Sequence, residues 1–421
     1  MTEIAFIGYT PKHRCAVNIN DTSYHSKYYN AKFAANSSLD YKCSIISDNF
    51  TSSECKYGYV YSKQPIRSSI TTEWDLVCKR NILPEVSQAV FSVGVMIGAI
   101  VFGSLADKYG RKRIFISCLI FQSLIGSCVS FATEYWQFVV LRVLVGCLEQ
   151  GVNIIGYILM LELFLERERT IFVSSYAQFW AVGGMYMSLL AYIFRDWRPL
   201  QFAISSPWIS AIVLIWILPE SITWLISKNK IEEADQILQK STLFYKNYTI
   251  EKNYLKKYKN SLSLDKNSLF KTELFNHKTK PIKYNASHLF KTPNVRKITI
   301  CVCILWFFNV VTYFGWSFHS PNLYGNVYLN FFIGQVVESI SFFITMVLIS
   351  RYGRIKIAAI FHIVAGIACI VGVFIPGTIY EYNIRWIQII FVMIAKLGFS
   401  ITGEIIYMYT PEIFPTCLRT T

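Results

Sequence analysis

Charge is scarce in this chain of 421 residues: Asp, Glu, Lys and Arg make up 16% of it, against roughly a quarter of an average soluble domain. The six histidines are scattered, and the chain has no His-Glu-x-x-His, no Cys-x-x-Cys and no phosphate-binding loop. A soluble globular protein and the common metal, redox or nucleotide-dependent enzymes are therefore not expected, and no cofactor or metal is indicated. A signal peptide is not expected either, because the apolar stretch from Met1 to Tyr9 is short and carries Glu3.

Apolar residues, 53% of the chain, are gathered in long blocks and not in amphipathic stripes. Five blocks are free of charge: 86–106, 114–133, 171–194, 200–218 and 298–318. Four more carry one or two ionisable groups: 136–161, 327–350, 357–375 and 386–409. Each block is close to the roughly 20 residues that cross a bilayer as a helix, and unpaired backbone groups are not tolerated in hydrocarbon. The sequence predicts an all-α membrane protein with about nine transmembrane helices.

Basic residues are unevenly shared among the connections, which fixes the expected orientation. With Asp107 on the cytoplasmic side, the short inner connections hold ten Lys and Arg and the short outer ones hold three. The long segment 219–297 then lies inside; its 16 Lys and Arg against 7 Asp and Glu supply +9 of the net charge of +15. The basic balance indicates a surface beside the lipid bilayer, and no nucleic-acid partner is expected.

The other long polar segment, before residue 84, falls outside and has the features of a secreted loop. Its cysteines are Cys15, Cys43, Cys55 and Cys78. Its Asn-x-Ser/Thr acceptors for glycans are Asn20, Asn36 and Asn49. Four cysteines permit three pairings, and two disulfides would stabilise a loop with few apolar residues. Free cysteines and unused acceptors are the alternative, because these short motifs also arise by chance.

Two short motifs recur at almost the same distance along the chain. The segment Tyr109-Gly110-Arg111 is matched by Tyr352-Gly353-Arg354, 243 residues later. Glu162, followed after six residues by Arg169-Thr170, is matched by Glu412 and Arg419-Thr420 at an offset of 250. Each motif follows a predicted span at its cytoplasmic end. The pattern indicates two parallel halves joined by the basic loop, an arrangement used by transporters.

Several segments resemble known families. Gly103-Ser-Leu-Ala-Asp107-Lys-Tyr-Gly110-Arg111-Lys112, Arg142 with Gly146, and Pro219-Glu220-Ser221-Ile-Thr-Trp224-Leu225 resemble the major facilitator superfamily. Within it, the segments 72–78 (TEWDLVC), 195–198 (RDWR) and 409–416 (YTPEIFPT) resemble the organic cation, anion and zwitterion transporters of the solute carriers. The resemblance implies a two-bundle fold of twelve spans. The first, eleventh and twelfth spans are not expected in this chain, which is therefore expected to be incomplete.

The resemblance divides the chain into four regions. Residues 1–83 hold the end of the first helix, at Ala5 to His13, and the extracellular cysteine loop. Residues 84–218 form the N-terminal bundle of helices 2 to 6, and residues 219–297 form the basic cytoplasmic loop. Residues 298–421 form the C-terminal bundle of helices 7 to 10.

Residues at the cytoplasmic helix ends are candidates for a gate. They are Asp107, Gly110, Arg111, Glu162, Arg169, Arg354, Glu412 and Arg419. Charge pairs and contacts with helix termini would hold the cytoplasmic side shut. Ser350 stands where the first half has Asp107, which predicts a weaker hold in the second half. A mere membrane boundary would explain the arginines but not Asp107, Gly110 or Glu162.

Besides His362, five ionisable residues fall inside predicted spans, where each costs at least about 2.5 to 3.5 kcal/mol unless it faces a cavity or a partner. They are Arg142, Glu149, Glu338, Lys396 and Glu404. Arg142 and Lys396 are expected to pair between helices, and Glu149 either pairs with Arg142 or marks the boundary. Glu338 and Glu404 resemble acidic positions of the cation branch, and Phe342 replaces an extra basic residue of the anion branch. Mutual neutralisation of Glu404 and Lys396 is the alternative.

Residues in the middle of spans complete the candidate substrate site. With the two glutamates, they are Tyr157, Tyr176, Gln178, Trp306 and Tyr313. Aromatic faces attract ammonium groups by about 0.5 to 2 kcal/mol each. Trp306 and Tyr313 share a helix face, and both match residue types of the cation branch. Packing is the alternative role for each ring; Trp180 and Asn309 are further candidates, and His362 is expected to be structural.

The sequence therefore predicts a plasma-membrane transporter, and no enzyme, that moves small organic cations by alternating access. A carnitine-like zwitterion, an organic anion and a sugar are alternative substrates, and a fragment unable to transport is the alternative to a carrier. A receptor or channel would not explain the repeated motifs. The residues indicate neither a coupled ion nor an oligomeric state.

Overall fold

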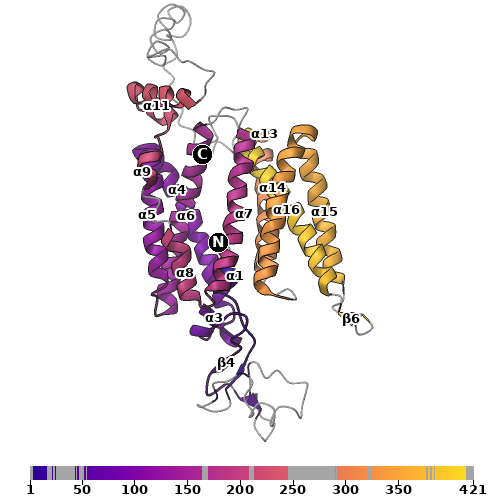
Figure 1. The fold of residues 1–421 in the computed structure, drawn as a ribbon. Helices are drawn as coiled ribbons and strands as arrows, with labels where there is room; N and C mark the ends of the chain where they lie inside the picture. The colour runs from indigo at the N-terminus through magenta and orange to yellow at the C-terminus, as the bar shows by residue number, and fades with distance from the viewer. Residues whose placement is uncertain are drawn as a thin grey trace, which may run out of the picture.

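Long helices that run side by side between two ends of the molecule make up the computed structural model (Figure 1). It describes residues 3–16, 21, 24, 43, 45–46, 52–53, 55–163, 169–207, 213–244, 290, 292–319, 325–375, 378–379, 382–383 and 385–413. We name the end that holds Asp107 the inner end and the opposite end, which holds Cys15, the outer end, after the sidedness that the basic residues predict. The helix α11 (Ile231–Phe244), which belongs to the basic segment 219–297, and the strand β4 (Tyr59–Tyr61) lie at opposite ends, as that sidedness requires.

Among the residues that the structure describes, the first half of the chain contributes five of these helices. They are α4 (Leu83–Tyr109), α5 (Arg111–Val129), α6 (Tyr135–Leu163), α7 (Arg169–Ile193) and α8 (Trp197–Ser205). Pro84 lies in the first turn of α4, where the backbone N–H that proline lacks would have had no partner within the helix. Helices α4 and α6 pack backbone to backbone, because a Cβ on Gly94 or Gly98 would overlap the carbonyl oxygens of Val143 and Cys147. Only glycine permits this approach at both positions.

The described part of the second half contains four helices. They are α13 (Pro293–His319), α14 (Val327–Tyr352), α15 (Arg354–Phe374) and α16 (Arg385–Ile413). The Asn326 side chain caps α14 by accepting hydrogen bonds from the Tyr328 and Leu329 amides. Helix α16 packs against α13, α14 and α15, so it lies at the centre of this half.

Shorter elements lie at the two ends. At the inner end are α9 (Leu214–Ile217), α10 (Ile222–Ser227) and α11. At the outer end are α1 (Ile4–Ile7), α3 (Ile70–Glu73), the 3-10 turn η1 (Cys78–Arg80), β1 (His13–Cys15), β2 (Ile45–Ile46), β3 (Ser52–Ser53), β5 (Thr378–Ile379) and β6 (Tyr382–Asn383). The strands form antiparallel pairs, β1 with β4, β2 with β3, and β5 with β6.

Seven of the nine predicted spans coincide with helices that are long and apolar enough to cross a membrane, within the described part of the chain. They are Cys78–Tyr109, Arg111–Val129, Tyr135–Glu162, Pro293–Gly315, Val327–Ile349, Arg354–Phe374 and Trp386–Thr410. Helix α7 matches the predicted span 171–194 but is less apolar than these seven. The span 200–218 is seen as α8 and α9, because residues 208–212 lie outside the described residues.

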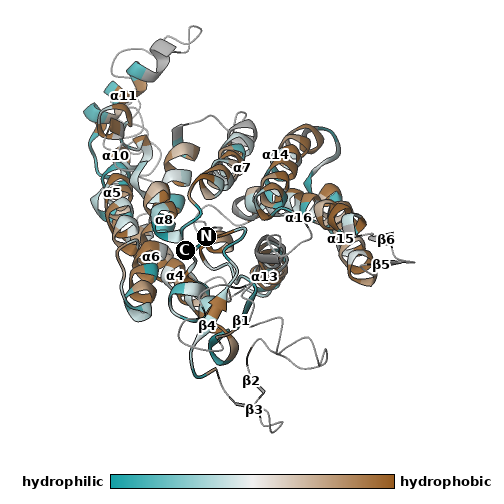
Figure 2. Cartoon of the chain, turned by 60° about the horizontal axis from the view of Figure 1, so that its bottom comes forward, coloured by the Kyte–Doolittle hydropathy of each residue, from teal (hydrophilic) through white to brown (hydrophobic). Residues whose placement is uncertain are grey.

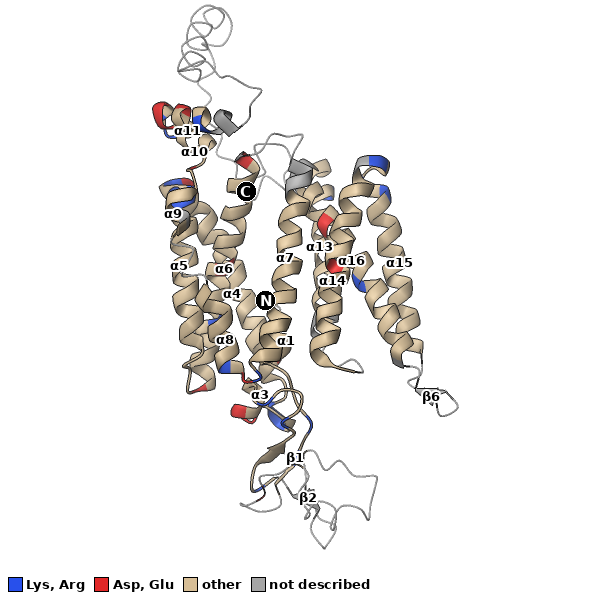
Figure 3. Cartoon of the chain, viewed as in Figure 1, with Lys and Arg blue, Asp and Glu red and all other residues tan. Residues whose placement is uncertain are grey.

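The surface of the helical region is apolar. Phe374, Trp216, Phe179 and Ile100 each expose more than two thirds of their side chain. The long helices are mainly brown in Figure 2, whereas α11 carries much of the teal. Figure 3 places most described charged residues at the two ends of the helices. An apolar belt between two polar ends is the surface expected of a protein whose middle part lies in a lipid bilayer.

The two halves meet along α7 and α14. Gln178 donates to the backbone carbonyl of Ser339 at 2.8 Å and accepts from its hydroxyl at 2.7 Å. Near the outer end, the Ser188 hydroxyl donates to the backbone carbonyl of Tyr328 at 2.9 Å. The halves are thus joined by polar contacts at both the middle and the outer part of this seam.

Tyr328 contacts several elements of the outer end. Its ring stacks on Phe6 of α1, with centroids 5.8 Å apart, and meets the Tyr192 ring edge to face. Its hydroxyl donates to the carbonyl of Pro65 at 3.0 Å. The short helix α1, predicted as the end of the first span, is buried between the halves, which closes this end by apolar packing.

Candidate functional site

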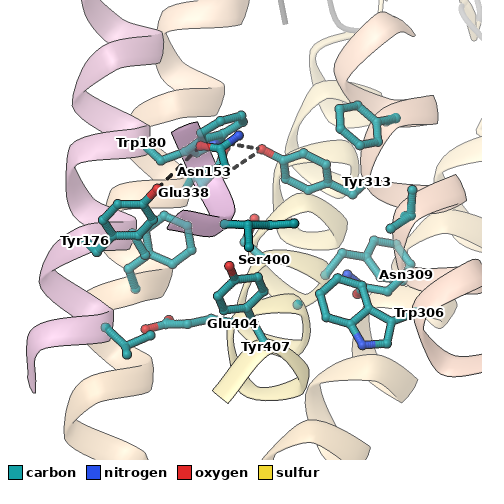
Figure 4. Close-up of a pocket in the computed structure, with 18 of the residues that line it drawn as sticks. Asn153, Tyr176, Trp180, Trp306, Asn309, Tyr313, Glu338, Ser400, Glu404 and Tyr407 are labelled. Atoms are coloured by element: carbon teal, nitrogen blue, oxygen red, sulfur yellow. Dashed lines mark hydrogen bonds between the residues drawn. The ribbon is translucent and has the colours of Figure 1, made fainter. Parts of the chain in front are cut away.

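A cavity of about 360 Å³ lies between α6, α7, α13, α14 and α16 (Figure 4). Its described lining comprises Gln150, Asn153, Ile154, Val173, Tyr176, Ala177, Trp180, Trp306, Asn309, Val310, Tyr313, Phe314, Glu338, Phe342, Phe399, Ser400, Gly403, Glu404 and Tyr407. The volume falls at the lower end of the range of small-molecule sites. Both halves of the chain contribute walls, so movement of one half against the other would reshape the cavity.

A chain of hydrogen bonds crosses the cavity from α7 to α14. The Trp180 indole N–H donates to the Tyr313 oxygen at 3.1 Å, and the Tyr313 hydroxyl donates to Glu338 Oε1 at 2.6 Å. Lys396 Nζ lies 3.4 Å from the other oxygen of Glu338. Glu338 is 1% exposed and Lys396 7%, so this is a buried pair between α14 and α16. The predicted pairing of Lys396 between helices is therefore confirmed.

Glu404 has different surroundings, although it lines the same cavity. The Ser174 hydroxyl of α7 donates to its Oε1 at 2.7 Å. The alternative in which Glu404 and Lys396 neutralise each other is wrong, because Lys396 pairs with Glu338. Two turns of helix, about 12 Å along the axis, separate positions 396 and 404.

Aromatic rings form most of the remaining wall. Tyr176 and Trp180 come from α7, Trp306 and Tyr313 from α13, and Tyr407 from α16. The Trp306 ring meets Tyr407 edge to face at 5.9 Å. No Lys, Arg or His belongs to the described lining. Carboxylates and ring faces without a basic residue make the cavity attractive to positive charge.

Two of the predicted substrate residues do not line the cavity. Tyr157 lies behind Tyr407, with ring centroids 4.8 Å apart, and supports that ring from α6. Gln178 is used in the seam with Ser339 and points away from the site. Neither residue belongs to the described lining, whereas Tyr176, Trp306, Tyr313, Glu338 and Glu404 do. The substrate contacts predicted for all seven stay predictions.

The sequence interpretation missed several lining residues. Tyr407 follows Glu404 by three residues and therefore shares its face of α16. Gln150 and Asn153 have the same spacing on α6, and the Tyr176 hydroxyl donates to Asn153 at 3.5 Å. A search for polar residues at helical spacing from the in-span glutamates would have found Tyr407 from Glu404 and Asn153 from Glu149.

Arg142 is the buried cation of the first half. It is 1% exposed, pairs with Glu3 beside α1, donates to Gln88 at 3.1 Å and lies over the Phe91 ring at 4.6 Å. The predicted role in helix pairing is confirmed. The direct ion pair of its guanidinium is with Glu3, and the charge of Glu149 also acts on Arg142.

A charge cluster holds the inner end of the first half together. Arg111 pairs with Glu162 and lies 3.5 Å from Asp107. Glu162 also accepts from the Ser221 hydroxyl, and the Trp224 indole donates to the Asp107 carbonyl at 2.9 Å. Gly110 supplies the turn between α4 and α5, with φ of 110°. Four of the predicted gate residues therefore meet in one place.

The other predicted gate residues are not brought into this cluster by the described contacts. Arg354 begins α15. Arg169 begins α7 and Glu412 lies in the last turn of α16, and their side chains are outside what the structure describes. Arg419 lies outside the described residues. The predicted pairs of Arg169 and Arg419 stay predictions.

The outer loop contains two disulfides, Cys15 with Cys55 and Cys43 with Cys78. This is one of the three pairings that four cysteines permit. The Tyr61 hydroxyl donates to Asp75 at 2.9 Å, and burial, then this carboxylate, raise the pKa of Tyr61. The glycan acceptors Asn20, Asn36 and Asn49 lie outside the described residues.

Two of the segments that resemble the organic ion transporters, 72–78 and 195–198, contact each other in the structure. Glu73 accepts from the Trp197 indole at 2.5 Å and from Arg198, whose guanidinium also donates to the carbonyls of Ser130 and Ala132. These bonds tie α3 to the start of α8 and the end of α5. The two segments therefore form one hydrogen-bonded contact at the outer end, away from the cavity.

Comparisons with known sequences agree on one family. The family model described as "Sugar (and other) transporter" matches residues 19–421. The organic cation transporter protein of Drosophila melanogaster is 30% identical over 413 residues, which cover 98% of this chain and 70% of that protein. Solute carrier family 22 member 4 of Mus musculus is 30% identical over 99% of this chain and 76% of its own length.

Solved structures have the same fold. The proton:xylose symporter XylE, of the major facilitator superfamily, bound to 6-bromo-6-deoxy-D-glucose, matches with a TM-score of 0.61 and 17% identity over 83% of this chain and 78% of that chain. The inward open form of the xylose transporter XylE from E. coli matches with a TM-score of 0.58 and 16% identity, over 81% and 74%. At this identity the likeness concerns the fold alone.

Proposed function

Because the chain belongs to the sugar (and other) transporter family of the major facilitator superfamily, we propose that this integral membrane protein carries small organic cations across the plasma membrane by alternating access. The observation that supports this substrate class is the lining of the central cavity. Glu338, Glu404 and a ring of aromatic side chains line it, and its described lining holds no basic residue.

The charge balance favours a cation over an anion. Two carboxylates face the cavity and one ammonium, that of Lys396, lies behind Glu338. An anion would meet Glu404 without a compensating cation in the lining, which is costly in a site of low dielectric. An ammonium ion gains both a carboxylate and the ring faces of Tyr176, Trp306 and Tyr407.

A zwitterion is the second candidate. Lys396 is close enough to the cavity to hold Glu338, and a substrate carboxylate could compete with Glu338 for it. Relatives of Rattus norvegicus and Mus musculus are named organic cation/carnitine transporter 2. A zwitterion that inhibits uptake more strongly than a cation of equal size would favour this candidate.

The gate is proposed to work through contacts at the two ends of the molecule. At the inner end, Arg111, Glu162 and Asp107 hold the first half together; at the outer end, Tyr328 holds α14 against α1 and α7. Opening of the inner side is proposed to break the inner contacts, and opening of the outer side is proposed to break the contacts of Tyr328. The two bundles, residues 84–218 and 298–421, are the rigid parts in this proposal.

Uptake of a fluorescent organic cation tests the proposal. The full chain, with an epitope tag, is expressed in cultured cells, and its amount at the surface is measured by biotinylation. Saturable uptake above that of untransfected cells is expected. Glu338→Gln and Glu404→Gln should each lower uptake at low concentration about tenfold or more, because a hydrogen bond to a charged group contributes about 1.5 to 3 kcal/mol.

Glu134→Gln is the matched control, because Glu134 is exposed at the outer end before α6. It should leave uptake per surface molecule unchanged. Surface protein without uptake would contradict the transport function. Uptake that is equal in the wild type and both cavity variants would contradict the cation site.

A further inference from the structure

The negative charges of the two cavity carboxylates are balanced in different ways. Glu338 has a fixed counter-ion, Lys396, 3.4 Å from Oε2, and its other oxygen accepts from Tyr313. Glu404 accepts one hydrogen bond, from Ser174, at Oε1. Its Oε2 accepts no hydrogen bond from the described residues, and none of the ion pairs among them includes Glu404. The side chain is 5% exposed.

The groups around Glu404 do not supply a cation. The titratable and charged groups on the packed helices are Glu149 and Tyr157 on α6, Tyr176 on α7, Tyr313 on α13, Glu338 on α14, and Lys396 and Tyr407 on α16. Lys396 is the one cation in this set and is held by Glu338. The hydroxyl of Thr345, on α14, lies beside Glu404 and donates to the Ser341 carbonyl at 2.8 Å; a hydroxyl supplies no positive charge.

A buried carboxylate in this position has two favourable states. An ionised carboxylate without a partner pays a desolvation penalty of several kcal/mol, and the group avoids it by taking up a proton or by pairing with a cation. Glu338 is paired with a cation, Lys396, within the protein. Glu404 can pair with a cation only when one enters the cavity.

We propose that Glu404 exchanges a proton for the cationic substrate, so that the carrier is an organic cation/proton antiporter. The inference rests on the proposed function. On binding of the cation, the O–H bond of the Glu404 carboxyl breaks and the proton passes to water on the side to which the cavity is open. After release of the cation on the opposite side, the carboxylate takes a proton from water there, and the carrier returns protonated.

The exchange sets the charge balance of the cycle. One positive charge moves in each direction, so the full cycle moves no net charge. Glu338 takes no part in the exchange, because Lys396 stays with it in both halves of the cycle. Simple facilitated diffusion of a cation would instead move one charge per cycle and follow the membrane potential.

Reconstitution into liposomes tests the exchange. The full chain is incorporated into vesicles that contain pyranine, a pH-sensitive dye, and the probe is radiolabelled tetraethylammonium, which carries a permanent charge. The potential is held at zero with valinomycin and equal potassium. An acidic interior should drive accumulation of about tenfold per pH unit, with one proton leaving per cation taken up.

Three results decide between the two proposals. Accumulation that follows an inside-negative potential and not the pH gradient, with a silent pyranine signal, overturns the exchange and leaves cation transport intact. Absence of tetraethylammonium flux under every condition overturns the proposed function. Proton efflux coupled to uptake supports the exchange.

Two variants locate the exchanging group. Glu404→Asp keeps a carboxylate and should retain proton efflux with uptake, whereas Glu404→Gln should lose it. Glu338→Gln is the matched variant on α14 and should keep one proton per cation even where its affinity falls. Proton efflux that persists in Glu404→Gln, or that disappears in Glu338→Gln while its uptake continues, overturns the assignment to Glu404.

Discussion

The turns that follow Tyr109 and Tyr352 have the same sequence, Tyr-Gly-Arg, and a similar backbone, yet their surroundings differ. Gly110 has φ of 110° and Gly353 has φ of 79°, and each ends one long helix and begins the next. Both conformations lie in a region that residues other than glycine rarely adopt. The repeated segment therefore determines the shape of the turn in both halves.

The contacts around the first turn come from outside the repeated segment. Glu220 accepts hydrogen bonds from the backbone amides of Lys112 and Ser221, at 2.9 and 3.0 Å, and so caps the start of α5. Glu162 comes from the end of α6 and pairs with Arg111. The difference between the halves teaches that the turn is a shared framework and that the charge cluster is added to it by other elements.

Alanine at the two glycines should separate the shared framework from the added contacts. Backbone strain of about 1 to 3 kcal/mol is expected in both variants. A Cβ at Gly110 would also lie 2.8 Å from Glu220 Oε2, whereas nothing lies within 4 Å of one at Gly353. Displacement of Glu220 removes its helix-capping bonds, so Gly110→Ala should cost about 3 to 5 kcal/mol in total and Gly353→Ala about 1 to 3.

Thermal unfolding of the purified protein in detergent, followed by tryptophan fluorescence, measures this difference. A Gly110→Ala, Glu220→Gln double variant is the control, because it should lose less than the sum of the single changes. Equal shifts in Tm for the two glycine variants would show that Glu220 does not distinguish the turns.

Glu162→Gln should have a smaller effect. It removes the ion pair with Arg111, a side chain that is largely buried, and leaves that guanidinium with Asp107 at 3.5 Å. The expected loss is about 1 to 3 kcal/mol, measured as a lower Tm, with Glu134→Gln as the exposed control. A Tm no lower than that of the control would contradict a stabilising role of the cluster.

An exchange at the Asp107 and Ser350 positions should have the smallest effect. Ser350→Asp places a carboxylate four residues before Arg354, as Asp107 precedes Arg111. A gain of about 0.3 to 0.5 kcal/mol is expected, with an equal loss in Asp107→Ser, because these pairs lie at the membrane surface. The paired changes in Tm should have opposite signs and shrink at high salt; two changes of one sign would contradict this.

The long helices could be predicted because their apolar blocks match the thickness of a bilayer. Helix α7 was the least apolar of the predicted spans that are described throughout, and its polar residues have a use. Ser174 donates to Glu404, Gln178 bonds Ser339 and Ser188 bonds Tyr328, so α7 carries much of the contact between halves. Polarity within a span thus marked an interface.

The candidate site could be predicted only in part, because a sequence does not give the rotation of a helix about its axis. Tyr176 and Gln178 are two residues apart, which is about 200° around an α-helix. One therefore faces the cavity and the other faces α14, although both were predicted to line the site. The partner of Lys396 was out of reach for the same reason, since Glu338 lies on another helix.

The backbone contact between α4 and α6 limits how the protein can move. Where Gly94 and Gly98 meet the carbonyls of α6, no side chain separates the two helices, so there is no layer that could re-pack during a displacement. Relative sliding would drive main-chain atoms into each other. Helices α4 and α6 must therefore move together as one rigid unit. The contacts that rearrange during a transport cycle are those between the side chains of α7 and α14.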